Sequence, residues 1–187
     1  MIEVKLLNES GYEQALMGMA TSYKDPLLSL EDWWTPEVFA KAKKRAPKLA
    51  HMDGGHNKFL EHIELWIWVR APRGWWQEAD TYRLASKQSE STMHTITKRH
   101  LTQEDFSEPL PEDFLAHLNG LIDNKDWRLL KQHLPEGFMQ ARVWKMSYKT
   151  LRNVIQQRAS HRLPEWPIFC NEIWAQVEHP GLLIKEV

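Results

Sequence analysis

Alternating apolar and polar residues predict one strand near the start of the chain and another near its centre. Residues 2–7 (IEVKLL) alternate and predict a short opening strand. In residues 63–69 the odd positions are aliphatic and lie on one face, while Trp66 and Trp68 lie on the other. Because both faces are apolar, we expect this central strand to be covered on both sides and to end at Pro72.

Helical periodicity and end signals account for most of the remaining chain. Thr35-Pro36-Glu37 combines an N-cap, a proline at the first helical position and an acid near the positive helix end. It predicts a helix to residue 50, kinked or restarted at Pro47. Asp53-Gly54-Gly55 predicts a turn. Further helices are expected over 13–19, 74–84, 111–123, 126–134, 147–158 and 168–178.

These elements predict a helix-dominated α+β fold with a few central strands. No internal repeat, low-complexity tract or linker interrupts the sequence, so we expect a single domain spanning residues 1–187.

Composition limits the classes of partner. A net charge of -1 argues against a broad nucleic-acid footprint. No apolar run approaches the ~20 residues that a membrane span needs, and the N-terminus lacks the order of a signal peptide. The one cysteine, Cys170, rules out an internal disulfide and fits a reducing cytoplasm. We therefore expect a cytoplasmic protein with neither nucleic acid nor membrane as partner.

Several residues that often carry chemistry have a simpler structural explanation. The spacing of His51, His56 and His62 matches neither a helical zinc motif nor a Cys/His finger, so we expect no metal site there. Cys170 lies in the apolar stretch PIFCNEIW and is expected to be buried and inert. The ten tryptophans are expected mainly to pack the core, although Trp75-Trp76 could stack on a flavin or base.

Three polar segments are candidates for binding. Residues 81–91 (TYRLASKQSES) are too polar for a core, and 54–64 (GGHNKFLEHIE) combines a turn, a histidine and a carboxylate. Residues 149–158 place Lys149 with Asn153, and Arg152 with Gln156, four apart on a shared helical face. Taken alone, the last segment is also typical of a solvated basic face.

In this order, the segments resemble the flavin-dependent thymidylate synthases. That family carries G-H-x-x-x-x-E-H before a strand, then R-H-R, seven residues and a serine, and later N-x-R-x-x-x-N-x-x-x-x-R. The matching positions here are Gly55, His56, Glu61, His62, Arg83, Ser91, Ser147, Lys149, Asn153 and Arg158. Lys131 matches a basic residue upstream of the late block, and Ser22 matches the serine of an Ala-x-x-Ser element near the start.

The chain also departs from the family pattern. Thr81 and Tyr82 replace the first two residues of R-H-R, and Gln88-Ser89 replaces Asn-Glu. Met93 replaces an arginine, and the late block has serine and lysine where the family has asparagine and arginine. Cationic contacts to phosphate or flavin are thereby lost or softened, because lysine does not reproduce a bidentate arginine.

The resemblance implies a central, mostly antiparallel sheet flanked by helices, and a homotetramer with active sites at its interfaces. It implies FAD that takes hydride from NADPH, carbon from methylenetetrahydrofolate, and methylation of dUMP at C5 without an enzymatic nucleophile. Arg158 would be catalytic, touching the uracil and favouring loss of its N3 proton.

The resemblance also implies ligand positions. Those expected to bind the nucleotide are Glu78, Thr81, Ser89, Glu90, Ser91, Met93, Lys131 and Arg158. Those expected to bind the flavin are Ser22, His56, Lys58, Thr81, Tyr82, Arg83, Ser89, Ser147, Lys149 and Asn153. We expect Arg83 and Ser91 to face one cavity across a helix end and a loop.

Two alternatives remain open at this stage. The enzyme could act on another pyrimidine deoxynucleotide or deliver a hydroxymethyl group. The chain could also be a non-catalytic relative that binds nucleotide or flavin, although a pure scaffold has no need for Arg83, Ser91, Asn153 and Arg158 at these spacings.

Overall fold

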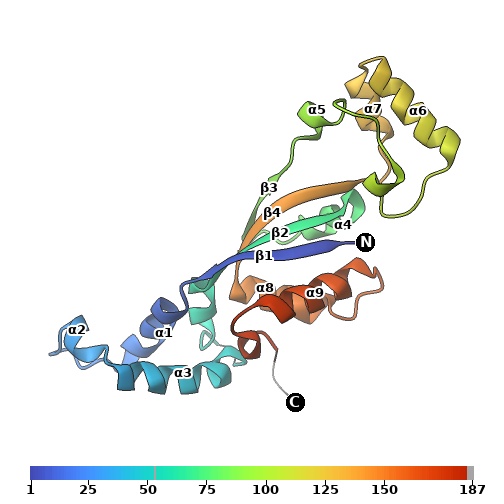
Figure 1. Ribbon diagram of the computed structural model, residues 1–187. Helices are drawn as coiled ribbons and strands as arrows, with labels where there is room; N and C mark the ends of the chain where they lie inside the picture. The colour runs from blue at the N-terminus through green and yellow to red at the C-terminus, as the bar shows by residue number, and fades with distance from the viewer. Residues whose placement is uncertain (53, 185–187) are drawn as a thin grey trace.

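The computed structural model describes residues 1–52 and 54–184, which form a four-stranded sheet with helices beside it and at both of its ends (Figure 1). The strands are β1 (Glu3–Ser10), β2 (Glu64–Pro72), β3 (Ala85–Ser89) and β4 (Met139–Ser147). The α-helices are α1 (Tyr12–Ala20), α2 (Leu30–Trp33), α3 (Pro36–Ala50), α4 (Arg73–Ala79), α5 (Thr92–Thr95), α6 (Glu112–Asp123), α7 (Trp127–His133), α8 (Tyr148–Arg158) and α9 (Glu165–Gln176). Short 3-10 helices are η1 (Thr21–Tyr23), η2 (Lys58–His62), η3 (Gln103–Asp105) and η4 (Pro180–Leu182).

The sheet has the strand order β1-β2-β4-β3, and every neighbouring pair is antiparallel. β2 and β4 pair without interruption from Glu64 opposite Ser147 to Pro72 opposite Met139. This confirms the predicted α+β fold with a mostly antiparallel sheet flanked by helices. β2 also ends at Pro72, as its sequence predicts.

Helices of the same chain cover one face of the sheet. Leu65, Ile67 and Val69 point to this face and are fully buried against α4, α8 and α9. On the other face Trp66 is 42% exposed and Trp68 is half-buried. The expectation that β2 is covered on both sides is therefore wrong within one chain, because no helix of the described residues packs on the face of Trp66.

Aromatic side chains fill the covered side of the sheet. Trp75 and Trp76 from α4 meet Trp144 from β4 and Trp166 from α9, with 4.5 Å between the ring centroids of Trp75 and Trp166. All four indoles are at most 1% exposed. Burial of one such ring contributes about 4–6 kcal/mol as an upper bound. The packing interpretation of Trp75 and Trp76 is confirmed, because neither ring is open to a ligand.

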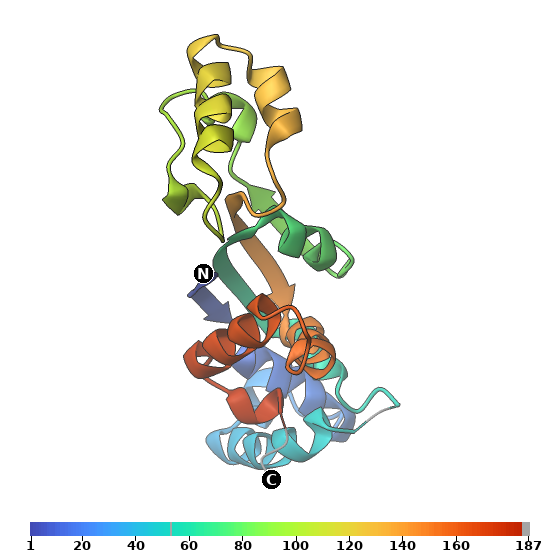
Figure 2. The same cartoon turned by 90° about the vertical axis from the view of Figure 1, so that its right-hand side faces the viewer.

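A second hydrophobic core lies beyond the sheet, in residues 91–138, which we call the distal lobe. Helices α5, α6 and α7 pack around Leu118 and Leu130, both fully buried. Figures 1 and 2 show the distal lobe standing away from the sheet, with β3 leading into it and β4 leading out. The chain therefore buries two separate apolar clusters.

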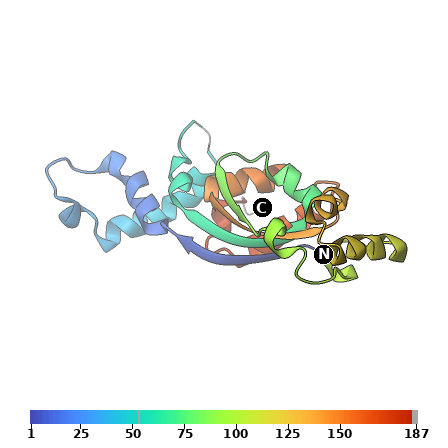
Figure 3. The same cartoon turned by 90° about the horizontal axis from the view of Figure 1, so that it is seen from above.

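Helices α1 and α3 extend the molecule at the opposite end, which makes it elongated (Figure 3). The Thr35 hydroxyl accepts a hydrogen bond from the backbone N–H of Val38, which confirms the predicted N-cap. α3 runs to Ala50 through Pro47 as one helix, so no restart occurs. No helix in the described ranges is long and apolar enough to cross a membrane.

The remaining sequence predictions agree with the structure to different degrees. The helix expected over 74–84 ends at Ala79, and β3 follows instead. Gly54 and Gly55 have φ angles of 71° and 90°, as a turn requires, whereas Asp53 lies outside the described residues.

Gly11 joins β1 to α1 at a point where only glycine fits. Its φ is 86°, and a Cβ built there would lie 2.3 Å from the carbonyl oxygen of His62. Gly11→Ala should therefore lower the free energy of unfolding by at least about 1–3 kcal/mol from backbone strain. Denaturant unfolding followed by circular dichroism measures the change.

Gly18 in α1 provides the matched control for this prediction. A Cβ there meets nothing within 4 Å, and the residue is helical. Gly18→Ala should stabilise the protein by roughly 0.5–1 kcal/mol through helix propensity. Equal effects of the two substitutions would contradict the role assigned to Gly11.

Candidate active site

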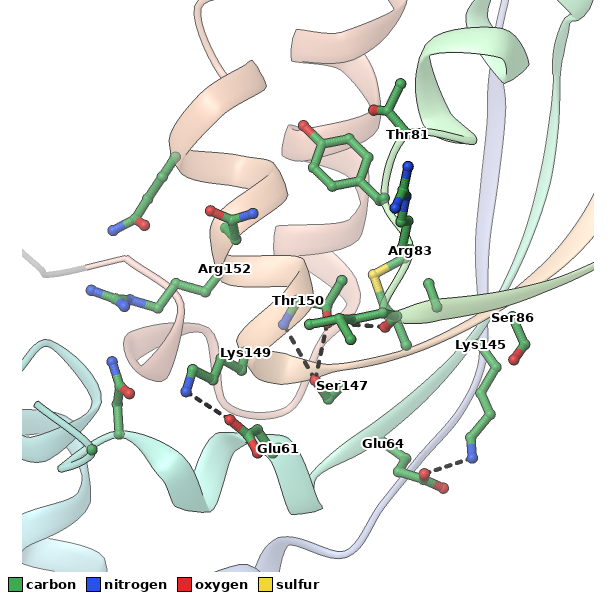
Figure 4. A pocket seen from close by; sticks show the side chains of 18 of the residues that line it. Glu61, Glu64, Thr81, Arg83, Ser86, Lys145, Ser147, Lys149, Thr150 and Arg152 are labelled. Atoms are coloured by element: carbon green, nitrogen blue, oxygen red, sulfur yellow. Dashed lines mark hydrogen bonds and ion pairs between the residues drawn. The ribbon is translucent and has the colours of Figure 1, made fainter. Parts of the chain in front are cut away.

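A cavity of about 970 Å³ lies where the first half of α8 meets the segment after α4 (Figure 4). Its walls come from five parts of the chain: the Gly54-Gly55 turn with η2, the start of β2, residues 81–86, the end of β4, and α8. The polar side chains around it include Glu61, Glu64, Tyr82, Arg83, Lys145, Ser147, Lys149, Arg152, Asn153 and Gln156.

The N-terminus of α8 is built directly onto the end of β4. The Ser147 hydroxyl caps the helix by accepting from the backbone N–H of Thr150 at 3.3 Å. The Thr150 hydroxyl in turn donates to the carbonyl of Leu84 at 3.1 Å. These bonds tie α8 to the segment that carries Arg83, and a cap of this kind is worth about 1 kcal/mol.

Two ion pairs line the cavity. Lys149 Nζ lies 2.7 Å from Glu61 Oε1, and Lys145 Nζ lies 2.6 Å from Glu64 Oε1. The hydrogen bond from Lys149 lowers the pKa of Glu61, so this carboxylate stays ionised near neutral pH. Since both pairs are partly exposed, they order side chains more than they stabilise the fold.

Two further cations at the cavity are not committed to a protein partner. Neither Arg83 nor Arg152 takes part in a side-chain hydrogen bond or ion pair with any described residue, and Arg152 Nε is buried without a partner. Four cations therefore face two carboxylates, Glu61 and Glu64, among the lining residues. An anionic ligand with several acceptor oxygens would satisfy this arrangement.

Arg158, at the far end of α8, belongs to a polar network beside the cavity. Its Nη1 donates to Glu78 Oε2 at 2.8 Å, and its Nε donates to the Tyr82 hydroxyl at 2.9 Å. The guanidinium also lies 4.8 Å from the ring centroid of Trp166. Tyr82 lines the cavity as well, so it connects the two sites.

The structure brings together six of the ten residues expected to bind a flavin. These six line the one cavity: Thr81, Tyr82, Arg83, Ser147, Lys149 and Asn153. Ser22 lies in η1, Lys58 lies in η2 with His56 just before it, and Ser89 ends β3; none of these four is among the lining residues.

The residues expected to bind the nucleotide are divided between two places. Glu78 and Arg158 meet beside the cavity, whereas Ser91 and Met93 begin the distal lobe and Lys131 lies in α7. Glu90 extends the sheet, since its N–H donates to the Ala141 carbonyl and its carboxylate accepts from the Ala141 N–H.

The expectation that Arg83 and Ser91 face one cavity is wrong within a single chain. Arg83 lines the cavity, but Ser91 does not. The reason is β3: its five residues pair with β4 and carry the chain roughly 17 Å away from Arg83. A helix end and loop, as expected from the sequence, would have kept the two residues closer.

Several lining residues were not assigned to the site from the sequence. Arg152 and Gln156 share a helical face that the four-residue spacing does reveal, but the family pattern does not include them. Lys145 lies on β4, a strand whose sequence gave no clear signal. Glu61 was noticed only as part of a motif, and its partner Lys149 lies 88 residues away.

The chain matches a known protein family and resembles solved structures. A profile of the family described as Thymidylate synthase complementing protein matches residues 5–179. None of the curated protein sequences matches the chain. The flavin-dependent thymidylate synthase ThyX from Helicobacter pylori, solved with FAD and dUMP, is 19% identical and superposes with a TM-score of 0.79, covering 97% of each chain.

A second solved relative is described as a methylase of both UMP and dUMP. The UMP/dUMP methylase PolB from Streptomyces cacaoi, solved with 5-Br dUMP, is 13% identical with a TM-score of 0.65. The superposition covers 94% of this chain and 89% of that one. At these identities the likeness establishes the shared fold.

The surroundings of Cys170 and of three histidines indicate structural or surface roles. Burial raises the pKa of Cys170 to about 12, so its thiol is not available as a thiolate nucleophile. His56 and His62 are exposed, and His51 Nε2 lies 2.9 Å from the Gly181 carbonyl. Their surroundings agree with the expected turn and surface roles.

Glu9, Glu178 and His179 form the one group within the described ranges that approaches metal-ligand spacing. The Glu9 carboxylate already accepts from the buried Tyr148 hydroxyl at 2.5 Å and from the Glu178 backbone N–H at 2.8 Å. These bonds attach the segment after α9 to β1 and α8, so the group has a structural explanation.

The raised pKa of Cys170 leads to a measurable property. At pH 7 the thiol is therefore protonated, and the side chain is buried. The native protein should therefore react with a thiol-specific disulfide reagent far more slowly than the protein unfolded in guanidinium. Rapid labelling of the native protein, followed by absorbance, would contradict a buried thiol.

Proposed function

The chain belongs to the family of thymidylate synthase complementing proteins, and we propose on this basis that it is a flavin-dependent enzyme that methylates dUMP at C5 to give dTMP. The profile match over residues 5–179 identifies the family, whose members are enzymes of the flavin-dependent thymidylate synthase type. The family predicted from the sequence is thus confirmed. The binding of FAD, the identity of the substrate and the identity of the co-substrates are our proposals for this chain.

The observation that carries the proposal is the convergence of six motif positions on one cavity. Thr81, Tyr82 and Arg83 come from the segment after α4, while Ser147, Lys149 and Asn153 come from α8 and its cap. These segments lie more than 60 residues apart in sequence. Their convergence supports a flavin-binding role for the cavity.

The charges of the cavity suit the diphosphate of FAD. Arg83 and Arg152 offer guanidinium groups that bond to no side chain or backbone group among residues 1–52 and 54–184, and Lys149 is shared with Glu61. A guanidinium binds phosphate oxygens through two parallel hydrogen bonds, which makes these arginines suitable holders. Asn153 and Gln156 would supply neutral hydrogen bonds.

Bound FAD would supply the hydride chemistry of the reaction. The chain itself would orient the pyrimidine and stabilise charge on it. We assign this part to Arg158, whose guanidinium is always protonated and would stabilise negative charge that develops on the base. NADPH as reductant and methylenetetrahydrofolate as carbon donor follow from the family resemblance and complete the proposed reaction.

Other pyrimidine substrates form the second candidate function. The described activity of the Streptomyces cacaoi relative, a UMP/dUMP methylase, favours this alternative because the same fold there serves a ribonucleotide. Turnover assays with dUMP, UMP and dCMP distinguish these substrates, and mass analysis of the product distinguishes methyl from hydroxymethyl transfer. A protein that binds nucleotide but never shows a flavin spectrum would instead be a non-catalytic relative.

We further propose that the active enzyme is a homotetramer with sites shared between chains. Ser91 and Lys131 belong to the distal lobe, while Arg158 belongs to α8, below the sheet in Figure 1. A second copy could supply the missing phosphate contacts to each cavity. The open sheet face with Trp66 also supports association, since exposed indoles are typical of interfaces. The cytoplasmic location stays a prediction.

Arg152→Ala tests the assignment of the cavity. Removing a cation whose buried Nε has no partner in the described part of the chain should raise the dissociation constant for FAD roughly 10- to 100-fold, the loss of one charge-assisted contact. Fluorescence titration with FAD measures it. Lys43→Ala, an exposed cation on α3, is the control and should bind FAD as the original protein does. Equal binding by both variants would mean that FAD binds elsewhere.

Mixing two variants with impaired turnover tests whether sites are shared between chains. Arg158→Lys keeps a charge beside Glu78 but loses the guanidinium fork, and Lys131→Ala loses a charge in the distal lobe. Each should lower turnover on its own. After dissociation and reassembly together, the mixture should regain turnover that neither has alone, because some sites receive both original residues. No recovery, or an active monomer in sedimentation, would rule out shared sites.

A further inference from the structure

Arg158 has most of its hydrogen-bonding capacity committed within the protein. A guanidinium has five N–H donors in a planar fork. Nε donates to the Tyr82 hydroxyl at 2.9 Å, and Nη1 donates to Glu78 Oε2 at 2.8 Å and lies 2.9 Å from Nε2 of His161. Nη2 makes no hydrogen bond to any residue that the structure describes. The two N–H groups on Nη2 are therefore the ones left for a ligand.

The two main partners of Arg158 are themselves held in place. Glu78 Oε2 also accepts from the indole N–H of Trp166 at 2.8 Å, and Trp166 is fully buried. The Tyr82 hydroxyl donates to Gln157 Oε1 at 3.0 Å, and its ring packs 5.9 Å from the ring of Trp166. The Arg158 side chain, 18% exposed, therefore has little freedom to rotate.

Glu78 approaches Arg158 from α4, and Tyr82 approaches it from the segment after α4, which also forms a wall of the cavity. Tyr82 lines the cavity but is only 8% exposed, and its hydroxyl is bonded to Gln157 and Arg158 of α8. The phenol gives its one proton to Gln157 and uses a lone pair to accept from Arg158 Nε. Its hydrogen-bonding capacity is thus directed at the arginine and away from any molecule in the cavity.

We infer that Tyr82 and Glu78 are positioning residues, which fix Arg158 so that Nη2 is the donor group presented to the substrate. This assignment differs from the roles that the family resemblance implied, flavin contact for Tyr82 and nucleotide contact for Glu78. The role of Arg158 at the pyrimidine base rests on the proposed function. The hydrogen bonds from Arg158 to Tyr82 and Glu78, which we call the clamp, do not depend on it. A donor fixed before the substrate arrives needs no reorganisation during the reaction, which is where preorganised groups gain their effect.

Tyr82→Phe tests the clamp through the pattern of kinetic change. It removes the hydroxyl and keeps the ring that packs against Trp144 and Trp166. We expect kcat to fall roughly 10- to 150-fold, the equivalent of one hydrogen bond to a charged group, with KM for the nucleotide and the flavin content little changed. Loss of flavin in place of kcat would overturn the inference, because Tyr82 would then be a flavin ligand.

Two controls separate positioning from general stability. Tyr148→Phe also removes a buried hydroxyl, one that bonds Glu9, and should lower the melting temperature while kcat is kept. Glu78→Gln keeps an oxygen that can accept from both Arg158 and Trp166 and should keep most of kcat, whereas Glu78→Ala should lose it. An equal loss of kcat in the two Glu78 variants would show that the negative charge of Glu78 is needed and that its hydrogen bonds are not sufficient. That result would overturn the positioning role of Glu78.

Chemical labelling tests the clamp without any turnover. Phenylglyoxal modifies arginines that are free to react, and mass spectrometry of peptides gives the rate at Arg158 relative to the exposed Arg162 nearby. We expect this ratio to rise in Tyr82→Phe and to stay unchanged in Tyr148→Phe. A constant ratio would overturn the inference even in an active enzyme. If the original protein turns over no pyrimidine nucleotide, the proposed function fails while the labelling still decides the clamp.

Discussion

Nine consecutive antiparallel residue pairs between β2 and β4 hold the molecule together. They bring the residues before β2 to the start of α8, since Glu64 lies opposite Ser147. Pairing of β3 with β4, which sets Ala85 opposite Met146, then adds the segment after α4 to the same place. Because β4 continues into α8 without a connecting residue, the pairing also sets the direction of that helix. The cavity is a consequence: Glu61 lies in η2, just before β2, Lys149 lies in the first turn of α8, just after β4, and the two side chains form an ion pair.

Much of this fold can be predicted from local sequence patterns, but β3 cannot. The cap at Thr35 and the aliphatic alternation of β2 each reflect one physical cause acting over a few residues. β3 lacks such a pattern, since Lys87 occupies its covered face. Burial lowers the pKa of Lys87, but the ammonium lies 4.9 Å from the Trp144 ring centroid and 3.6 Å from Asp80. A strand stabilised by these distant partners cannot be identified from its own residues.

The same distinction applies to the candidate site. The spacing along α8 correctly placed Lys149 and Asn153 on one face, because helical geometry is local. The approach of Glu78 to Arg158 spans 80 residues and depends on how α4 and α9 pack around Trp166. The sequence contains both residues but not their contact. For Ser91 the sequence instead predicts a proximity to Arg83 that a single chain does not have. A fixed spacing in sequence says little about distance in space when the intervening residues form a strand.

The two separate hydrophobic cores have a consequence for how the molecule opens. The distal lobe buries its own cluster around Leu118, and the sheet buries another around Trp144. Such units can open independently, each with its own free energy. Amide hydrogens in α6 and α7 can then exchange with solvent through local openings that leave β2 and β4 paired. A nucleotide phosphate held by the distal lobe would slow that exchange, so ligand occupancy would be recorded in the protection of helices far from the cavity.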